Sequence, residues 1–144
     1  MKKLLLTAVI ACFGYFASAQ IMVVTTYVDE IGEGVNKKEL DGADRLTQKM
    51  GIGYTVNEKI AVGFTKDGDE DYAVFFRYTI KDDIYAVGTM PTEDGSDKMK
   101  LGLGYSFNVW QSLYFEPSYT MPIKEDAVTG DRKGEFNFGL GYRF

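Results

Sequence analysis

Hydrophobic and polar residues alternate along most of this chain, in stretches of about ten residues separated by polar breaks. The clearest stretch is 136–144, where a large apolar side chain stands at every second position: Phe136, Phe138, Leu140, Tyr142 and Phe144. Successive side chains of a strand point to opposite faces. The pattern therefore predicts β-strands rather than helices.

Eight such segments follow one another, and we expect one strand in each. They lie near residues 20–29, 45–56, 59–66, 72–80, 84–91, 98–108, 112–122 and 134–144. The fifth shows no clean alternation. Pro117 in the seventh removes a ladder hydrogen bond, so we expect a bulge or local break there.

The small and polar set of positions is unusually rich in glycine. Its glycines are Gly51, Gly53, Gly63, Gly102, Gly104, Gly139 and Gly141. A solvated sheet face disfavours glycine, which weakens a strand, whereas the crowded interior of a narrow barrel needs small residues. We therefore predict an all-β fold, an antiparallel up-and-down transmembrane β-barrel of eight strands with its bulky apolar side chains facing lipid.

Four segments end on one repeated pattern, apolar-x-Tyr-x-apolar. Its tyrosines are Tyr54, Tyr78, Tyr105 and Tyr142, in segments two, four, six and eight. Alternate strands of an up-and-down barrel run in the same direction, so these rings should form an aromatic girdle at one end. The breaks that follow the first three are short (57–58, 81–83 and 109–111), as is typical of periplasmic turns, while the other breaks are mostly longer.

The first 19 residues have the features of a cleaved secretory signal peptide. Lys2 and Lys3 precede a short apolar run that ends at Ala17-Ser18-Ala19, and residues 20–144 would form the mature barrel domain. A second interpretation is a lipoprotein site at Cys12, the only cysteine. We favour the signal peptide because a complete cleavage site follows the apolar run.

The run from Phe136 to Phe144 resembles the C-terminal β-signal that the outer-membrane assembly machinery recognises. With the signal peptide and eight segments, the mature chain resembles the small eight-stranded, OmpX-like and OmpA-like outer-membrane barrels, a porin-like class. This resemblance implies a location in the bacterial outer membrane, contact with outer-membrane lipid and lipopolysaccharide, and engagement of the barrel assembly machinery during biogenesis.

Charged residues also occur on the polar face of the segments: Lys49, Arg77, Lys100, Glu116 and Arg143. An eight-stranded barrel has room inside for side chains but hardly for water. We expect these five to form a buried ionic network that plugs the lumen. The alternative is that they line a narrow polar pore.

Several kinds of chemistry are disfavoured. The chain has no histidine, the usual general base of the enzymes on such barrels, so we expect no catalytic activity and no cofactor. Asp67, Asp69 and Asp71 match the start of a calcium loop but lack its glycine at position six and its acid at position twelve, so we expect a solvated turn and no metal site. The net charge of −5 argues against nucleic acid as a partner.

Three functions remain open. The first is a non-enzymatic, monomeric envelope protein that acts through its external loops. The second is a small channel for ions or solutes. The third is a soluble periplasmic barrel of lipocalin type, in which the same alternation would turn inward around an apolar ligand.

Overall fold

The computed structural model describes residues 20–31, 38–66, 71–93 and 95–144. The expected signal peptide, including Cys12, lies outside these residues, as do Asp67 and Asp69. Within the described ranges, no helix combines the length and the apolar character needed to cross a membrane.

The described residues form a closed, eight-stranded antiparallel β-barrel, which confirms the predicted all-β architecture and strand number. In order around the wall, the strands are β1 (Ile21–Thr26), β4 (Lys49–Thr55), β5 (Ile60–Lys66), β6 (Tyr72–Lys81), β7 (Ile84–Pro91), β8 with β9 (Lys100–Tyr105 and Phe107–Trp110), β10 (Leu113–Pro122) and β11 (Glu135–Arg143). The first and last strands close the ring, from Met22 opposite Arg143 to Thr26 opposite Gly139.

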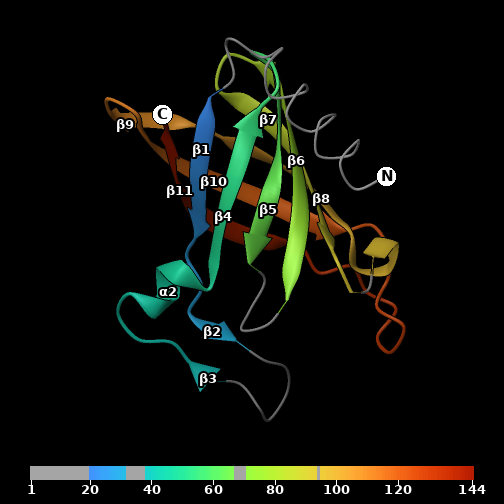
Figure 1. Ribbon diagram of the computed structural model, residues 1–144. Helices are drawn as coiled ribbons and strands as arrows, with labels where there is room; N and C mark the ends of the chain where they lie inside the picture. Colours follow the sequence, from blue (N-terminus) through green and yellow to red (C-terminus); the bar gives the residue numbers. More distant parts are fainter. Residues whose placement is uncertain (1–19, 32–37, 67–70, 94) are drawn as a thin grey trace, which may run out of the picture.

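The two ends of the barrel differ in the length of their connections. The start of β1, the end of β11 and the short β4–β5 and β6–β7 turns lie at the upper end in Figure 1. The opposite end carries the long connections, with the β2–β3 pair (Glu30–Ile31 and Lys38–Glu39) and helix α2 (Asp44–Thr47) at the bottom of Figure 1 and the short helix η2 (Gly95–Lys98) on its right. We call these the short-turn end and the long-loop end.

Local chemistry explains the short turns. The side-chain Oδ1 of Asn57 accepts hydrogen bonds from the backbone N–H groups of Lys59 and Ile60 at 2.9 and 2.8 Å, which folds the β4–β5 connection back on itself. Asp82 and Gln111 adopt positive φ angles of 48° and 45°. Tight two-residue hairpin turns require such angles.

The predicted irregularity at Pro117 takes the form of a gap in the neighbouring strand. β10 pairs with β9 up to Phe115 opposite Phe107 and resumes with β8 at Ser118 opposite Gly104. Two residues separate these pairs on each strand, so the register is unchanged and only the ladder is interrupted. Proline has no N–H to donate, which accounts for the break.

Several strand boundaries differ from the sequence-based expectation, and β1, for example, ends at Thr26 rather than at residue 29. Segment two begins as helix α2 and becomes a strand only at Lys49, because Arg45 is held by residues of the preceding loop rather than by a neighbouring strand. β9 continues to Trp110, so the turn is at Gln111–Ser112 rather than 109–111. A register shift at Leu113/Tyr114 accommodates the extra residues.

β7 explains why segment five lacked clean alternation. It pairs regularly with β6 and β8, yet its larger residues Tyr85 and Val87 face the interior while Ala86 and Gly88 face outward. The middle of this strand inverts the size pattern of its neighbours, whereas Ile84 and Met90 near its ends are large and exposed. The alternation of large outer and small inner residues is therefore interrupted within the segment.

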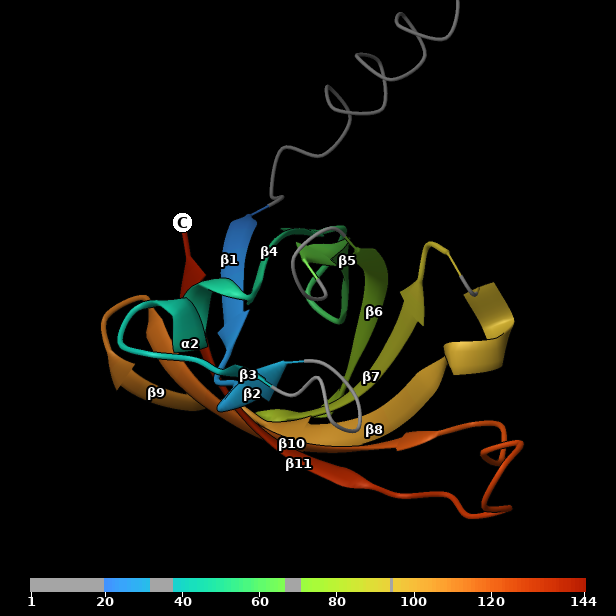
Figure 2. The ribbon, with the colours of Figure 1, turned by 90° about the horizontal axis from the view of Figure 1, so that it is seen from below.

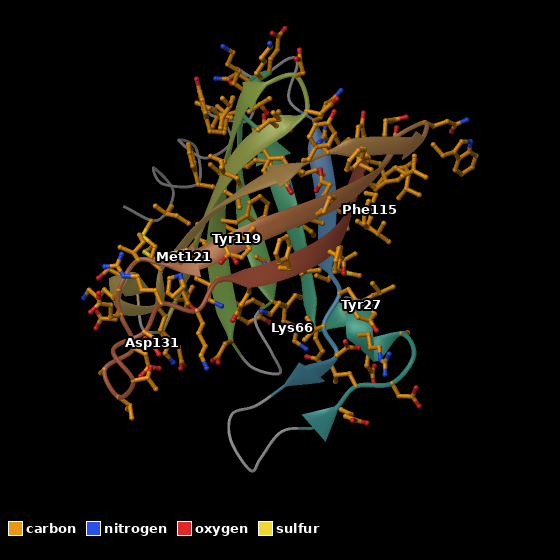
Figure 3. All side chains as sticks on the ribbon, turned by 180° about the vertical axis from the view of Figure 1, so that it is seen from behind. Tyr27, Lys66, Phe115, Tyr119, Met121 and Asp131 are labelled. Atoms are coloured by element: carbon orange, nitrogen blue, oxygen red, sulfur yellow. The ribbon has the colours of Figure 1, made fainter. Side chains whose placement is uncertain are left out.

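Large apolar side chains otherwise cover the outside of the wall. Phe64 and Phe136 are 63% and 77% exposed, and Phe115, Tyr119 and Met121 follow one another along the outer face of β10 (Figure 3). The buried apolar side chains among the described residues are few: Met22, Leu40, Ala61, Ala73, Phe75 and Tyr85. The barrel is apolar outside and has charged and polar groups inside.

Candidate functional site

A charge cluster centred on Glu116 spans the interior of the barrel. The Nη1 and Nη2 groups of Arg77 donate to the two carboxylate oxygens of Glu116, each at 2.8 Å. Arg143 donates to the same carboxylate at 3.0 Å, and the hydroxyl of Ser106 donates at 2.9 Å. Strands β6, β10 and β11 are thereby joined across the lumen through one carboxylate.

Two tyrosine rings pack against the flat guanidinium groups of these arginines. The guanidinium of Arg77 lies 4.0 Å from the centre of the Tyr85 ring, and that of Arg143 lies 3.9 Å from the centre of the Tyr114 ring. Such cation–π contacts favour arginine and strengthen where water is excluded. The arginines are therefore fixed both in their plane and perpendicular to it.

Of the five predicted lumen charges, the structure brings three into one cluster, Arg77, Glu116 and Arg143. The other two lie closer to the long-loop end. Lys100 forms a separate ion pair with Glu135 at 2.9 Å, a partner that the sequence reasoning did not include. Lys49 lines the same lumen at the start of β4.

The interior glycines make room for the rings that fill the lumen. A Cβ at Gly53 or at Gly63 would stand 2.6 Å from the ring of Phe75, and one at Gly104 would overlap the ring of Tyr85. These glycines were predicted to suit a crowded interior, but the rings that occupy the space were missed. The sequence signal for Tyr85 was weak because segment five lacks clean alternation, whereas the ladder places Tyr85 on the inner face, two residues from Val87, which lies opposite Arg77.

On the long-loop side of the charge cluster, a cavity of about 140 Å³ extends toward the long-loop end. Arg77 and Glu116 form part of its floor together with Phe75 and Tyr85. Hydroxyl and amide groups line its middle, among them Ser118, Thr120 and Asn137, and Lys49, Lys98, Lys100 and Glu135 stand near its mouth. Figure 2 views the barrel from this end.

The four tyrosines of the predicted girdle lie near one end of the barrel. They lie close to the C-terminal ends of β4, β6, β8 and β11, next to the short-turn end, and are Tyr54, Tyr78, Tyr105 and Tyr142. Tyr78 and Tyr142 are exposed on the outer face, as is Tyr105, whose ring packs at 4.4 Å against Phe107. The arrangement is a partial ring of phenols on the outer surface.

The residues of the predicted assembly signal form the outer row of β11. Phe138 stacks with Phe115 of β10 at 6.2 Å, Phe136 contacts Tyr119 at 4.9 Å, and Tyr142 meets Phe144 edge-on at 4.8 Å. Leu140 lies in the same row, opposite Phe115 in the β10–β11 ladder. These rings form a continuous apolar strip that faces away from the lumen.

Arg45 connects separate parts of the long loop between β1 and β4. Its Nε donates to the backbone carbonyl of Leu40 at 2.7 Å, and its Nη1 donates to the hydroxyl of Tyr27 at 2.8 Å. That hydroxyl in turn donates to Asp29 at 2.7 Å. The hydrogen bond with Tyr27 raises the pKa of Arg45 above its ordinary value.

The β10–β11 loop is ordered around Asp126. Its carboxylate accepts hydrogen bonds from the backbone N–H groups of Val128 and Thr129 at 2.7 and 3.1 Å, and these bonds lower the pKa of Asp126. Lys124 at the base of this loop pairs with Asp97 in η2 and lowers the pKa of that carboxyl. The loop presents Val128 at its tip, 93% exposed.

No group of acids, cysteines or histidines suited to a metal ion occurs in the part of the chain that the structure describes. The acidic run considered as a calcium loop is described only at Asp71. Comparisons with protein-family models, with curated proteins and with solved structures return no match. The geometry of the barrel therefore carries the functional argument.

Proposed function

We propose that this protein is a non-enzymatic β-barrel of a bacterial outer membrane, closed to solutes, that presents its long loops outside the cell. The observation that carries the proposal is the inverted burial of the wall. Large apolar side chains such as Phe64 and Phe136 face outward, while Arg77, Glu116 and Arg143 meet inside. A protein surrounded by water rarely exposes a contiguous apolar surface of this kind, whereas a lipid-embedded barrel requires it.

The positions of the tyrosines and loops support an orientation in the membrane. Phenol rings favour the boundary between hydrocarbon and headgroups, and the four tyrosines lie beside the short turns. Short turns face the periplasm and long loops face outward in outer-membrane barrels. We therefore place the start of β1 and the end of β11 on the periplasmic side.

The two other functions have less support. A lipocalin-type barrel needs an apolar interior, but the interior here is crossed by an ion cluster. A conducting pore needs a continuous aqueous path, and the buried side chains of Met22, Phe75 and Tyr85 and the Glu116 cluster occupy the lumen. A catalytic role has no histidine to serve as general base.

The same proposal includes the partners of the barrel. Lipid and lipopolysaccharide surround the apolar wall of a monomer, and the barrel assembly machinery recognises the strip from Phe136 to Phe144 during insertion. The ordered loops at the other end, with their exposed charges and Val128, offer the surface through which the protein contacts other molecules.

Cell fractionation and a pair of variants test the membrane proposal. The protein should stay with the outer membrane until detergent is added, and its gel mobility should change on heating. Phe64→Arg should destabilise the barrel in lipid by about 2–4 kcal/mol, the range for arginine near the midplane of a bilayer. Val128→Arg, which adds the same charge at a loop tip, should have no measurable effect.

Release into the soluble periplasmic fraction without detergent, or a harmless Phe64→Arg substitution, would overturn the proposal. Planar-bilayer recordings test the closed lumen separately. We expect a flat current trace at all voltages for the refolded protein, and reproducible single-channel steps would favour the channel instead.

A further inference from the structure

The outer surface of the barrel wall has a groove along β7, which lies between β6 and β8 (Figure 2). In the ladder, Gly88 of β7 is flanked by Phe76 of β6 and Leu101 of β8. Ala86, two residues earlier, lies opposite Leu103 of β8. The three flanking side chains are large and about half exposed. The small residues of β7 therefore form the floor of the groove, and larger residues of the neighbouring strands form its two sides.

The dimensions of the groove suit an extended chain of carbon atoms. Its volume of about 650 Å³ is more than four times the roughly 150 Å³ of an engineered cavity that holds benzene. The groove follows β7 from Ala86 to Met90, a distance of about 13 Å at the usual rise of a strand. One leaflet contributes about 15 Å to the hydrocarbon thickness of a bilayer. The groove can thus take most of one acyl chain.

The lining excludes ligands that need hydrogen bonds. Every residue of the groove is apolar or glycine except Thr89, which also lines the lumen. From Ala86 to Thr89, the backbone of β7 is paired with strands on both sides. No strand edge is therefore free here for an extended peptide. The groove offers contacts to hydrocarbon alone.

The shape of the groove also disfavours a second copy of the barrel. Two-fold dimers place the same surface patch of each copy against the other. Two barrels joined through β7 would bring two hollow surfaces together, because the floor of each consists of Ala86 and Gly88. The void between them would lose dispersion contacts. A flexible chain fills such a groove without needing a matching ridge.

We propose that this groove holds one acyl chain of a lipid of the surrounding bilayer more tightly than the rest of the wall does. The inference rests on the proposed location in a membrane. Inside a bilayer there is no hydrophobic driving force, and association depends on van der Waals packing. A chain in the groove contacts protein on the floor and on both sides, whereas a chain on a flat wall contacts it on one side only. Met90 and Met99 line the groove with flexible side chains that adapt to the chain.

Methionine methyl groups serve as matched probes in the full mature barrel, refolded in phosphatidylcholine nanodiscs. Met90 lines the groove, whereas Met50 and Met121 lie on the outer faces of β4 and β10; the three are 40%, 44% and 39% exposed. Nuclear Overhauser effects from lipid-chain protons to isotope-labelled methyl groups report how closely and how persistently the chains contact each residue. We expect an effect at Met90 about twofold stronger than at Met50 or Met121, since a chain in the groove is in contact on several sides.

Two variants fill the groove and should remove this difference. Gly88→Leu and Ala86→Leu should each lower the effect at Met90 to the level of the two control methionines. A Cβ at Gly88 would stand 3.1 Å from the end of the Leu101 side chain, which can turn away, so we expect the barrel to fold. The control Ile52→Phe enlarges an exposed side chain of β4 and should leave the effect at Met90 unchanged.

The outcomes separate the groove from the membrane location. Equal effects at the three methionines of the wild type would overturn the acyl-chain site and leave the membrane location intact. Lipid effects at none of the three would contradict both. Effects at Met90 from the protons of another barrel, in a sample that mixes labelled and unlabelled protein, would assign the groove to a dimer and overturn the acyl-chain site.

Discussion

Replacing Glu116 with glutamine removes the one negative charge of the cluster while keeping the size of the side chain. In the wild-type barrel, the carboxylate accepts hydrogen bonds from Arg77, Arg143 and Ser106 at distances of 2.8 to 3.0 Å. The amide keeps one acceptor oxygen, but two guanidinium groups then lie close together without a counter-charge. We therefore expect a large loss of stability.

The burial of the partners sets the magnitude. The side chains of Arg77 and Glu116 are only 11% and 3% exposed. Removing one partner of such a buried pair typically costs about 3–5 kcal/mol, because the remaining charge stays buried. The matched control is Lys100→Met, which breaks the more exposed pair with Glu135 and should cost at most about 1 kcal/mol.

Urea titration of the barrel refolded in lipid vesicles measures both free energies of unfolding. Trp110, the only tryptophan, reports unfolding by fluorescence, and gel mobility provides an independent measure. The double variant Arg77→Met with Glu116→Gln should lose less stability than the sum of the two single changes, since the pair is coupled. If Glu116→Gln costs no more than Lys100→Met, the cluster does not hold the barrel as argued.

Three further changes test other parts of the barrel. Phe144→Ala should lower outer-membrane assembly, measured as the folded fraction on unheated gels, more than the loop substitution Val128→Ser does; equal assembly would remove the special role of Phe144. Gly104→Ala should destabilise the barrel by about 1–3 kcal/mol in urea because its methyl group meets a lumen ring, whereas Gly88→Ala on the outer face should be nearly neutral; equal effects would contradict a packed lumen. The lowered pKa of Asp126 means that its hydrogen bonds support the loop above the ordinary aspartate pKa of about 3.9 and are lost as the pH falls through the lower folded value. The protection of this loop's amides from hydrogen exchange, relative to their intrinsic rates at the same pH, should therefore fall in acid, and Asp126→Asn, which keeps an acceptor oxygen, should abolish that pH dependence; a wild-type protection that does not change in acid would contradict the assignment.

Much of the wall was predictable because alternation depends on nearest neighbours in the sequence. The expected segments 59–66 and 72–80 match β5 and β6 to within a residue. Helix α2 was not predictable in this way, because it is held by the contacts of Arg45 with a loop that precedes it by many residues. The end of β9 depends on a register shift against β10, and the alternation of residues within one segment does not predict such a shift.

Alternation along the strands also predicted some of the residues that face the lumen. Parity along each strand identified Arg77, Glu116 and Arg143 as interior residues. The alternation does not give the position of a residue along the barrel axis. Lys49 and Lys100 were therefore assigned to the same network as the other three charges, although they lie nearer the long-loop end. The position along the axis depends on how neighbouring strands are shifted relative to one another, and only the register of each strand pair gives that shift.

Because the first and last strands pair and close the barrel, the order in which the strands follow one another in the sequence could be changed. β11 ends beside the start of β1, and the backbone N–H of Phe144 donates to the carbonyl of Ile21 at 2.9 Å. A short linker joining these two positions would permit a circular permutant, opened instead within the loop 123–134. All eight strand pairings would be kept, but a different strand would emerge last from the ribosome. The architecture of this barrel does not depend on which strand comes last in the sequence, whereas the proposed recognition of the strip from Phe136 to Phe144 by an assembly machinery would depend on it.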